Sequence, residues 1–305
     1  MIAEAAAALA AGRLVILPTE TVYGLAADAA DPRAVAAIFE AKGRPRFNPL
    51  IAHVDGADAA RRIAVFDDRA EILAQAFWPG PLTLVLPVRE GEAVCDLARA
   101  GLDTVAVRVP GHPIARALLA AFGGPVVAPS ANRSGRPSPT THADAVAETG
   151  ASAAAALDGG ACTVGLESTV VALLPGEPAR LLRPGAVTRA QIEALIGPLA
   201  EAQADAKRSP GRLALHYAPD APVRLNVDAP KPGEAYLAFG PHAAGQGVFN
   251  LSPTANLTEA AANLFSHLRA ADRLKPIAIA VAPIPPEGLG EAINDRLARA
   301  AGFVG

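Results

Sequence analysis

Short apolar runs alternate along the chain with longer stretches in which apolar residues recur at helical spacing. Apolar runs of roughly four to eight residues bounded by Gly, Pro or polar residues are typical of buried strands, whereas helices need longer amphipathic segments. In the first two-thirds of the chain this pattern predicts strands at Arg13–Leu17, Ile51–Val54, Leu82–Pro87, Thr104–Val109, Pro125–Ala128, Ser168–Leu174 and Ala179–Leu182. It predicts helices at Met1–Gly12, Pro32–Ala41, Arg69–Phe77, Pro113–Phe122 and Thr188–Ile196. The alternation indicates an α/β fold with one large mixed sheet and flanking helices.

The pattern is interrupted in residues 198–219, which contain three prolines and no clear periodicity. We interpret this segment as a linker. Beyond it the alternation begins again, with strands predicted at Val223–Val227, Ala235–Phe239 and Pro276–Val281 and helices at Leu257–Leu274 and Gly290–Ala301. The chain is therefore expected to have two domains, 1–197 and 220–305, joined by that linker.

Composition narrows the class of protein. A chain of 305 residues that is 51% hydrophobic can bury a sizeable core. The net charge of −3 argues against broad, nonspecific binding of nucleic acid, which requires an excess of Lys and Arg. Two cysteines, Cys95 and Cys162, are too few for a disulfide framework. Because no apolar run approaches the roughly 20 residues that span a bilayer and no basic leader opens the chain, we expect a cytoplasmic protein without membrane contact.

Polar residues gather where predicted strands end, and strand ends are where loops build binding sites. The segment Pro18–Leu25 follows the first predicted strand and includes Thr19, Glu20, Thr21 and Tyr23. Such groups could recognise a small polar metabolite, but they are equally typical of a capped turn. Residue types alone leave both readings open.

Three cations, Lys42, Arg44 and Arg46, lie between a predicted helix and the next strand. They could surround a polyphosphate, or they could be a basic helix end that complements the helix dipole. Pro45 and Pro49 favour anion binding, because they stiffen a loop that a merely solvated run of charge would not need to be rigid.

Two further side chains stand at strand ends. Arg108 is a lone cation in an apolar predicted strand, and such a cation is costly to bury unless it meets an anion. That anion could be an internal carboxylate or a group of a substrate. His53 ends the strand that follows the Arg44 loop, and a lone histidine in such a place is more often structural than a ligand.

The loop Ala128–Thr140 combines hydroxyl, amide and guanidinium groups with three prolines. This composition suits contacts to ribose and phosphate, and the prolines argue against a flexible surface loop. Ser168 at a strand start and Arg183 at a strand exit extend the pattern. Motifs of a P-loop, a nucleophile elbow, a zincin or a zinc ribbon are absent from the sequence.

These segments resemble the YrdC-like family, and more closely its long two-domain threonylcarbamoyl-AMP synthases. The similar motifs run through the first domain in family order: PTETVYGL from Pro18, KGRPRFNPL from Lys42, WPGPLTLVL from Trp78, GLDTVAVRVP from Gly101, APSANRSGRPSPT from Ala128, GLESTVV from Gly165 and LLRPGAVT from Leu181. SPG at Ser209–Gly211 and HYAP at His216–Pro219 are similar to the linker of the long form.

The resemblance implies a twisted mixed sheet with a large concave, cationic cavity, a small Rossmann-like C-terminal domain, and a linker that folds across the cavity. It implies an enzyme that makes threonylcarbamoyl-AMP and pyrophosphate from L-threonine, bicarbonate and ATP with Mg²⁺. That reaction is the first step of N6-threonylcarbamoyladenosine formation in tRNA. The product would pass to the machinery that modifies tRNA, and this chain is not expected to bind tRNA stably.

The resemblance also implies roles for individual residues. Threonine would be held by Thr19, His53, Arg108 and Ser168, with its carboxylate on Arg108. ATP would be surrounded by Lys42, Arg44, Thr104, Ser130, Asn132, Ser138, Arg183 and Tyr217. Lys42, Arg44 and Arg108 would stabilise charge during the reaction, and no metal ligands are assigned.

The linker departs from the family pattern, because Arg212–Leu215 holds one cation where basic and aromatic residues are usual. It therefore offers the triphosphate less charge than is usual in the family. Two other functions are compatible with a YrdC-like domain. An RNA-binding module is disfavoured by the overall acidity, and carbamoyl transfer in metal-centre maturation uses larger proteins with zinc fingers that two cysteines cannot form.

Overall fold

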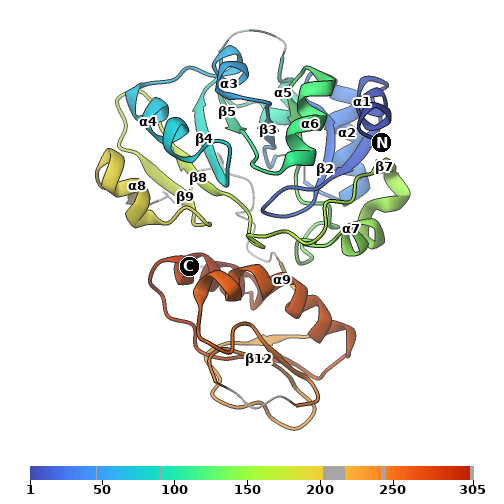
Figure 1. The fold of residues 1–305 in the computed structure, drawn as a ribbon, viewed down its shortest axis with the longest axis vertical. Coiled ribbons are helices and arrows are strands. Elements are labelled where there is room, and N and C mark those ends of the chain that lie inside the picture. Colours follow the sequence, from blue (N-terminus) through green and yellow to red (C-terminus); the bar gives the residue numbers. More distant parts are fainter. Residues whose placement is uncertain (46, 90, 92, 202–216, 242–244, 303–305) are drawn as a thin grey trace.

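The computed structural model describes residues 1–302 except 46, 90, 92, 202–216 and 242–244 (Figure 1). The described chain forms two α/β units, a larger one around a ten-stranded sheet and a smaller one around a four-stranded sheet. Helix α9 (Leu257–Arg273) of the smaller unit faces the larger unit in Figure 1. No helix among the described residues is both long enough and apolar enough to cross a bilayer. The expected two-domain α/β fold is confirmed.

The large sheet is mixed and runs in the order β10-β9-β8-β4-β5-β3-β6-β2-β1-β7. Its strands are β1 (Leu14–Leu17), β2 (Gly24–Asp28), β3 (Ile51–His53), β4 (Leu82–Pro87), β5 (Thr104–Arg108), β6 (Val126–Val127), β7 (Ala153–Ala156), β8 (Thr169–Ala172), β9 (Arg180–Arg183) and β10 (Ala200–Glu201). Strands β3 and β5 are parallel neighbours with His53 opposite Arg108. These two residues, which were predicted at strand ends, are therefore neighbours in the sheet.

Helices cover the two faces of this sheet unequally. One face is packed by α2 (Pro32–Lys42), α3 (Ala57–Ile63), α4 (Asp68–Phe77), α5 (Asp96–Arg99), α7 (His142–Thr149) and α8 (Arg189–Ile196). On the other face α1 (Ile2–Ala10) and α6 (Pro113–Phe122) cover β1, β2, β6 and β7 at one end of the sheet. Alternation along the strands puts a separate apolar cluster on that same second face: Ile51, Val85, Ala106, Val170, Ala172 and Leu182. No described helix contributes to this cluster, so the face is open there to loops and ligands.

Local sequence sets the ends of the helix that leads into the site. Helix α2 begins after Asp31, whose carboxylate accepts a hydrogen bond from the backbone N–H of Arg33, and Pro32 occupies the first helical position. It ends at Gly43, whose φ of 58° is in the left-handed region that glycine adopts readily. The chain therefore turns sharply after Lys42 into the Arg44 loop.

The smaller unit has a four-stranded sheet in the order β11-β14-β12-β13, and all three strand pairs are parallel. Its elements are β11 (Val223–Arg224), β12 (Ala235–Ala238), β13 (Val248–Asn250), β14 (Ile279–Val281), α9 and α10 (Leu289–Ala300). A parallel sheet packed by helices agrees with the expected Rossmann-like character.

The two units share a core and a set of ion pairs. Val22 and Leu166 of the larger unit pack into the apolar core of the smaller one. Gly165 has a φ of 74°, and a Cβ atom there would lie 2.5 Å from the Cα atom of Ala262 in α9. Ion pairs between described residues of the two units include Arg136–Asp272, Arg189–Glu291, Arg269–Glu148, Arg273–Asp144 and Arg296–Glu167. The smaller unit is thus in close contact with the larger one through packed backbone and paired charge.

Some elements differ from the sequence-based expectation. Strands β2, β7, β10 and β13 and helices α3, α5 and α7 were not predicted, and β10 pairs with β9 beyond residue 197, where we expected the first domain to end. Cys95 and Cys162 are free thiols. The linker segments Ser209–Gly211 and Arg212–Leu215, together with His216 and Arg46, lie outside the described residues.

Candidate active site

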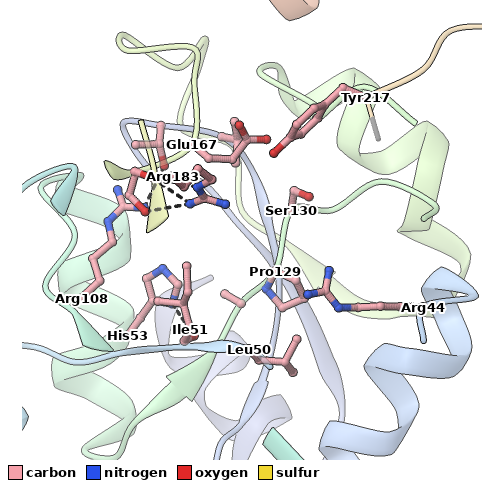
Figure 2. A pocket seen from close by; sticks show the side chains of 14 residues that line it. Arg44, Leu50, Ile51, His53, Arg108, Pro129, Ser130, Glu167, Arg183 and Tyr217 are labelled. Carbon is pink, nitrogen blue, oxygen red and sulfur yellow. Dashed lines mark hydrogen bonds between the residues drawn. The ribbon is translucent and has the colours of Figure 1, made fainter. Parts of the chain in front are cut away.

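A pocket lies on the open part of the second sheet face, where strand ends and loops of the larger unit meet the end of the linker (Figure 2). Its polar lining comes from Thr21, Arg44, His53, Arg108, Ser130, Glu167, Ser168, Arg183 and Tyr217. In Figure 2 Arg44 and Arg108 lie on opposite sides, with Pro129 and Ser130 on the side of Arg44. Residues more than 170 positions apart in sequence, such as Arg44 and Tyr217, therefore face one space.

The loop between β1 and β2 is a tight turn that delivers one hydroxyl to the pocket. The Thr19 Oγ1 atom donates to the Val22 carbonyl at 2.6 Å and lies 2.8 Å from Thr21 Oγ1. It also accepts from the backbone N–H groups of Thr21 and Val22 at 3.2 Å each. The hydroxyl of Thr19 therefore organises the turn, and Thr21 lines the pocket. The structure shows the turn, and recognition of a metabolite by Thr21 stays a prediction.

Arg108 ends β5 and is held by three hydrogen bonds. Its guanidinium donates from Nε to the Gly80 carbonyl at 3.1 Å, from Nη1 to Thr21 Oγ1 at 2.9 Å and from Nη2 to Glu20 Oε1 at 2.6 Å. Burial alone would raise the pKa of Glu20, but the charge of Arg108 and its hydrogen bonds lower it overall. The buried cation thus has an internal carboxylate as partner, and two N–H groups remain that could meet a substrate.

His53 is buried at the end of β3, next to Arg108 in the sheet. Its Nδ1 atom lies 3.1 Å from the Ile51 carbonyl, which can only accept, so Nδ1 carries the proton. Burial and the neighbouring charge of Arg108 lower the pKa of His53 to about 3. The imidazole is therefore neutral at physiological pH, with Nε2 as a hydrogen-bond acceptor.

Lys42 and Arg44 have different surroundings although they are two residues apart. The ammonium group of Lys42 donates to the backbone carbonyls of Ser130 and Asn132, and burial together with the charge of Arg44 lowers its pKa well below the usual value. Arg44 lines the pocket, donates to the Pro49 carbonyl at 3.3 Å, and has a buried Nε atom without a hydrogen-bond partner among the described residues. Burial lowers the pKa of Arg44 to about 10, so it stays cationic. Lys42 supports a loop, and Arg44 faces the open space.

In the loop that follows β6, one predicted residue lines the pocket and two lie buried behind it. Ser130 lines the pocket, whereas the Asn132 side chain donates to the carbonyls of Arg133 and Arg136 at 2.8 and 2.9 Å and fixes the loop. The Ser138 hydroxyl donates to Glu167 and is fully buried. Of the three predicted ATP contacts in this loop, only Ser130 is at the pocket surface.

Arg183, at the end of β9, points into the pocket beside Ser168. Its Nε and Nη2 atoms donate to the Ser168 carbonyl at 3.1 and 2.9 Å, and Nη2 also reaches Ser168 Oγ at 3.1 Å. Ser168 Oγ lies 2.7 Å from Thr83 Oγ1. Toward described residues Arg183 makes hydrogen bonds only to these neutral oxygens, so its charge is not cancelled by direct contact with a carboxylate.

Tyr217 closes one side of the pocket at the described end of the linker. It is 1% exposed, and its ring lies 5.3 Å from that of Phe265 and 5.4 Å below the guanidinium of Arg296. Burial raises the pKa of Tyr217 to about 12, so the phenol stays protonated. The next residue, Ala218, donates its N–H to the Gly135 carbonyl at 2.7 Å and ties this end of the linker to the loop after β6.

The structure brings most of the predicted site residues together, at different depths. Those that line the pocket are Arg44, His53, Arg108, Ser130, Ser168, Arg183 and Tyr217. Those that lie behind it are Thr19, Lys42, Asn132 and Ser138. Thr104 begins β5, four residues before Arg108 on the same face of the sheet and about 13 Å away along the strand, outside the pocket.

Sequence reasoning missed Glu167 as part of the site, and it named Glu20 and Thr21 only as members of a polar segment, without a role for either. Glu20 and Thr21 fix Arg108, and Glu167 lines the pocket with a carboxylate. Burial alone would raise the pKa of Glu167, but the charges of Arg296 and Arg183 lower it to about 2, so it is an anion. The signal that could have found it is a lone acid directly before the buried strand β8.

Two family models and several relatives match this chain. Residues 7–185 match the family model Sua5_yciO_yrdC, described as Telomere recombination, and residues 187–302 match Sua5_C, described as Threonylcarbamoyl-AMP synthase, C-terminal domain. A threonylcarbamoyl-AMP synthase of Bacillus subtilis is 40% identical over 99% of this chain and 93% of that protein. One of Pyrococcus abyssi is 41% identical over 96% of this chain and 91% of that protein.

The fold has a solved counterpart over almost its whole length. The crystal structure of P. abyssi Sua5 complexed with L-threonine superposes with a TM-score of 0.91 at 39% identity and covers 99% of this chain and 94% of that one. The two family models cover the two units of this chain, and the P. abyssi structure covers both units. The chain therefore belongs to the Sua5/YciO/YrdC family, in the form that carries a Sua5 C-terminal domain.

Proposed function

We propose that this chain is a threonylcarbamoyl-AMP synthase that converts L-threonine, bicarbonate and ATP into threonylcarbamoyl-AMP, pyrophosphate and water. The names of the full-length relatives support this function. The single observation in the molecule that carries it is the pocket in which Arg44, Arg108 and Arg183 meet neutral hydroxyl and imidazole groups. Such a set suits a ligand that has both a polyphosphate and a small polar part.

The Arg108 side of the pocket is suited to threonine. The two remaining N–H groups of Arg108 can receive the carboxylate, and Glu20 and Thr21 keep the guanidinium oriented. Neutral His53 can accept from the threonine ammonium or hydroxyl through Nε2, and the Ser168 hydroxyl lies near the same space. Thr19 would act through the turn that presents Thr21.

Arg44 and Arg183 are suited to ATP, although they lie on different walls of the pocket. Both cations line the pocket without direct contact to a described carboxylate, so they can interact with phosphate oxygens. Ser130 adds a hydroxyl, and Lys42 and Asn132 would act by holding the loop that carries it. Ser138 would act through Glu167. Thr104 could reach ATP only if the nucleotide extends along the open sheet face.

Mg²⁺ does not fit a site made by the described side chains. No cluster of three metal-ligating residues is found among them. The two carboxylates at the pocket are engaged, Glu20 by Arg108 and the Gly111 N–H, and Glu167 by Arg296 and Ser138. We therefore propose that any Mg²⁺ enters with the phosphates of ATP.

The reaction then requires that the substrates are positioned and that the charge of the leaving group is stabilised. The threonine amine and bicarbonate form a carbamate with loss of water, and a carbamate oxygen attacks the α-phosphate while pyrophosphate leaves. Holding threonine on Arg108 and ATP on Arg44 and Arg183 brings the reacting groups together. Because Arg44 and Arg183 are buried, their charges act strongly on the leaving pyrophosphate.

The free space between the lining side chains is about 50 Å³. Pockets that hold drug-sized ligands have volumes of roughly 300–1,000 Å³, so this conformation is more closed than one that holds ATP and threonine. Tyr217, near the end of residues 198–219, is a wall residue contributed by the described part of the linker. This supports our expectation that the linker covers the site and opens for substrates.

Pyrophosphate release tests this function. The full chain with ATP should release pyrophosphate only when L-threonine and bicarbonate are both present. Release that persists when threonine is omitted would contradict the proposal. The product would be consumed by the machinery that transfers the threonylcarbamoyl group to tRNA.

A further inference from the structure

One arginine of the C-terminal unit reaches the wall of the pocket. Arg296, on α10, is 1% exposed. Its Nε atom donates to Glu167 Oε2 at 2.8 Å, Nη2 donates to the Pro184 carbonyl at 3.0 Å, and Nη1 donates to Asp295 at 2.6 Å. The same guanidinium lies over the ring of Tyr217.

Glu167 both pairs with Arg296 and lines the pocket, so it links the C-terminal unit to the site. One carboxylate oxygen accepts from Arg296 and the other accepts from Ser138. The side chain also lines the pocket, and in Figure 2 its oxygens point toward Tyr217 and lie near Arg183. A carboxylate on this wall would repel phosphates unless another charge balances it.

We propose that Arg296 of the C-terminal unit is a positioning residue for the phosphate-binding side of the active site: it holds and neutralises Glu167 and thereby leaves Arg183 available for ATP. This inference rests on the proposed function. It gives the C-terminal unit a role in substrate binding that the larger unit cannot supply alone, because both walls formed by Glu167 and Tyr217 contact Arg296.

The charges around Glu167 explain why Arg296 is needed. Arg296 and Arg183 are the two cations that act most strongly on this carboxylate. Arg183 now donates to Ser168, while Arg296 makes the direct ion pair. Without Arg296 a buried carboxylate would lack its partner, and Arg183 is the next cation able to pair with it. The uncompensated charge of Glu167 would then repel the phosphates of ATP, and Arg183, paired with Glu167, could no longer bind them.

Other contacts between the units provide a matched control. Glu291 lies on the same helix α10 and accepts from Arg189 of the larger unit at 2.7 Å, and neither residue lines the pocket. Glu291→Gln removes one charge pair between the units, as Arg296→Gln does, without changing the pocket wall. The Arg296 pair is more buried than the Arg189–Glu291 pair, so R296Q should cost more stability, but a role of Arg296 in domain contact alone would leave the ATP KM of both variants alike.

The test uses the full chain and the variants R296Q, E167Q, R296Q/E167Q and E291Q. Thermal unfolding, the KM for ATP and threonine, and equilibrium binding of ATP are measured for each. We expect R296Q to raise the ATP KM by at least about tenfold, with the threonine KM changed less than about twofold. In the E167Q background the same substitution should change the ATP KM by less than about twofold, because the charge to be balanced is gone. E291Q should keep the wild-type ATP KM.

An R296Q protein with wild-type ATP KM, or equal effects of R296Q with and without Glu167, would overturn the inference. If R296Q does not fold, the R296Q/E167Q variant provides the test. A folded double variant with the ATP KM of E167Q supports the inference, and an unfolded one, or one with a still higher ATP KM, contradicts it. Failure of the proposed function is distinguishable, because it appears as absent threonine-dependent turnover in the wild type, whereas ATP binding still reports on Arg296.

Discussion

Replacing Arg108 by Gln should lower both the free energy of unfolding and the rate of the reaction, and the two losses can be measured separately. Arg108 is 3% exposed, and its partner Glu20 keeps backbone N–H donors such as that of Gly111 but loses its ion pair when the guanidinium is removed. Breaking a buried ion pair on one side costs about 3–5 kcal/mol of folding free energy. Since domains are usually stable by about 5–15 kcal/mol, R108Q should remain folded near 25 °C.

The catalytic loss in R108Q has a different origin. Removing a charged group that stabilises the reacting complex costs about 2–4 kcal/mol. This corresponds to a fall of roughly 30- to 900-fold in kcat/KM for threonine. The double variant R108Q/E20Q removes both charges, so it should regain at least about 2 kcal/mol of stability but none of the lost activity.

Denaturant unfolding and threonine-dependent pyrophosphate release measure the two effects. The exposed pair Arg61–Glu71, at 2.7 Å with both side chains more than 40% exposed, provides the control. R61Q should cost far less stability than R108Q, because water screens that pair. If R108Q/E20Q regained wild-type kcat/KM for threonine, Arg108 would support the fold without binding substrate, and our account of the threonine side would be wrong.

Two further predictions concern stability. Because the pKa of His53 is about 3 in the folded chain and about 6.5 in an unfolded one, the wild type should lose stability as pH falls from about 6.5 toward 3. H53Q should reduce that loss by about 1.4 kcal/mol per pH unit in denaturant unfolding between about pH 6 and 4, and an unchanged slope would exclude a buried neutral imidazole. G165A should destabilise the chain more than G176A in thermal unfolding. Both glycines have φ near 74°, but only at Gly165 would the new Cβ meet the α9 backbone, so equal costs would contradict that contact.

Apolar runs predicted the central strands well because these strands are buried on both faces and rich in branched residues. They failed at β7, whose sequence is four alanines. Alanine prefers helix, yet β7 forms a strand because it pairs in parallel with β1 at the sheet edge. Strand β2 was missed for a related reason, since Gly24–Asp28 is short and contains little β-favouring sequence.

The candidate site was predictable where a residue was unusual in its own segment. Arg108 stands out as a cation in an apolar strand, and Arg44 and Ser130 lie in proline-stiffened loops. The partners of these residues depend on the fold, so the sequence does not show that Glu20 pairs with Arg108 or that Glu167 pairs with Arg296. Arg296 is an ordinary position on an amphipathic helix, and only the packing of α10 against the larger unit brings it to Glu167.

The central claim is that one pocket joins an amino acid, bicarbonate and the α-phosphate of ATP. Mass spectrometry of a reaction with ATP, L-threonine and ¹³C-bicarbonate tests it most directly. We expect an AMP adduct that contains threonine and one ¹³C atom, formed in proportion to the pyrophosphate released. Pyrophosphate without that labelled adduct, or ADP and phosphate as the nucleotide products, would contradict the account.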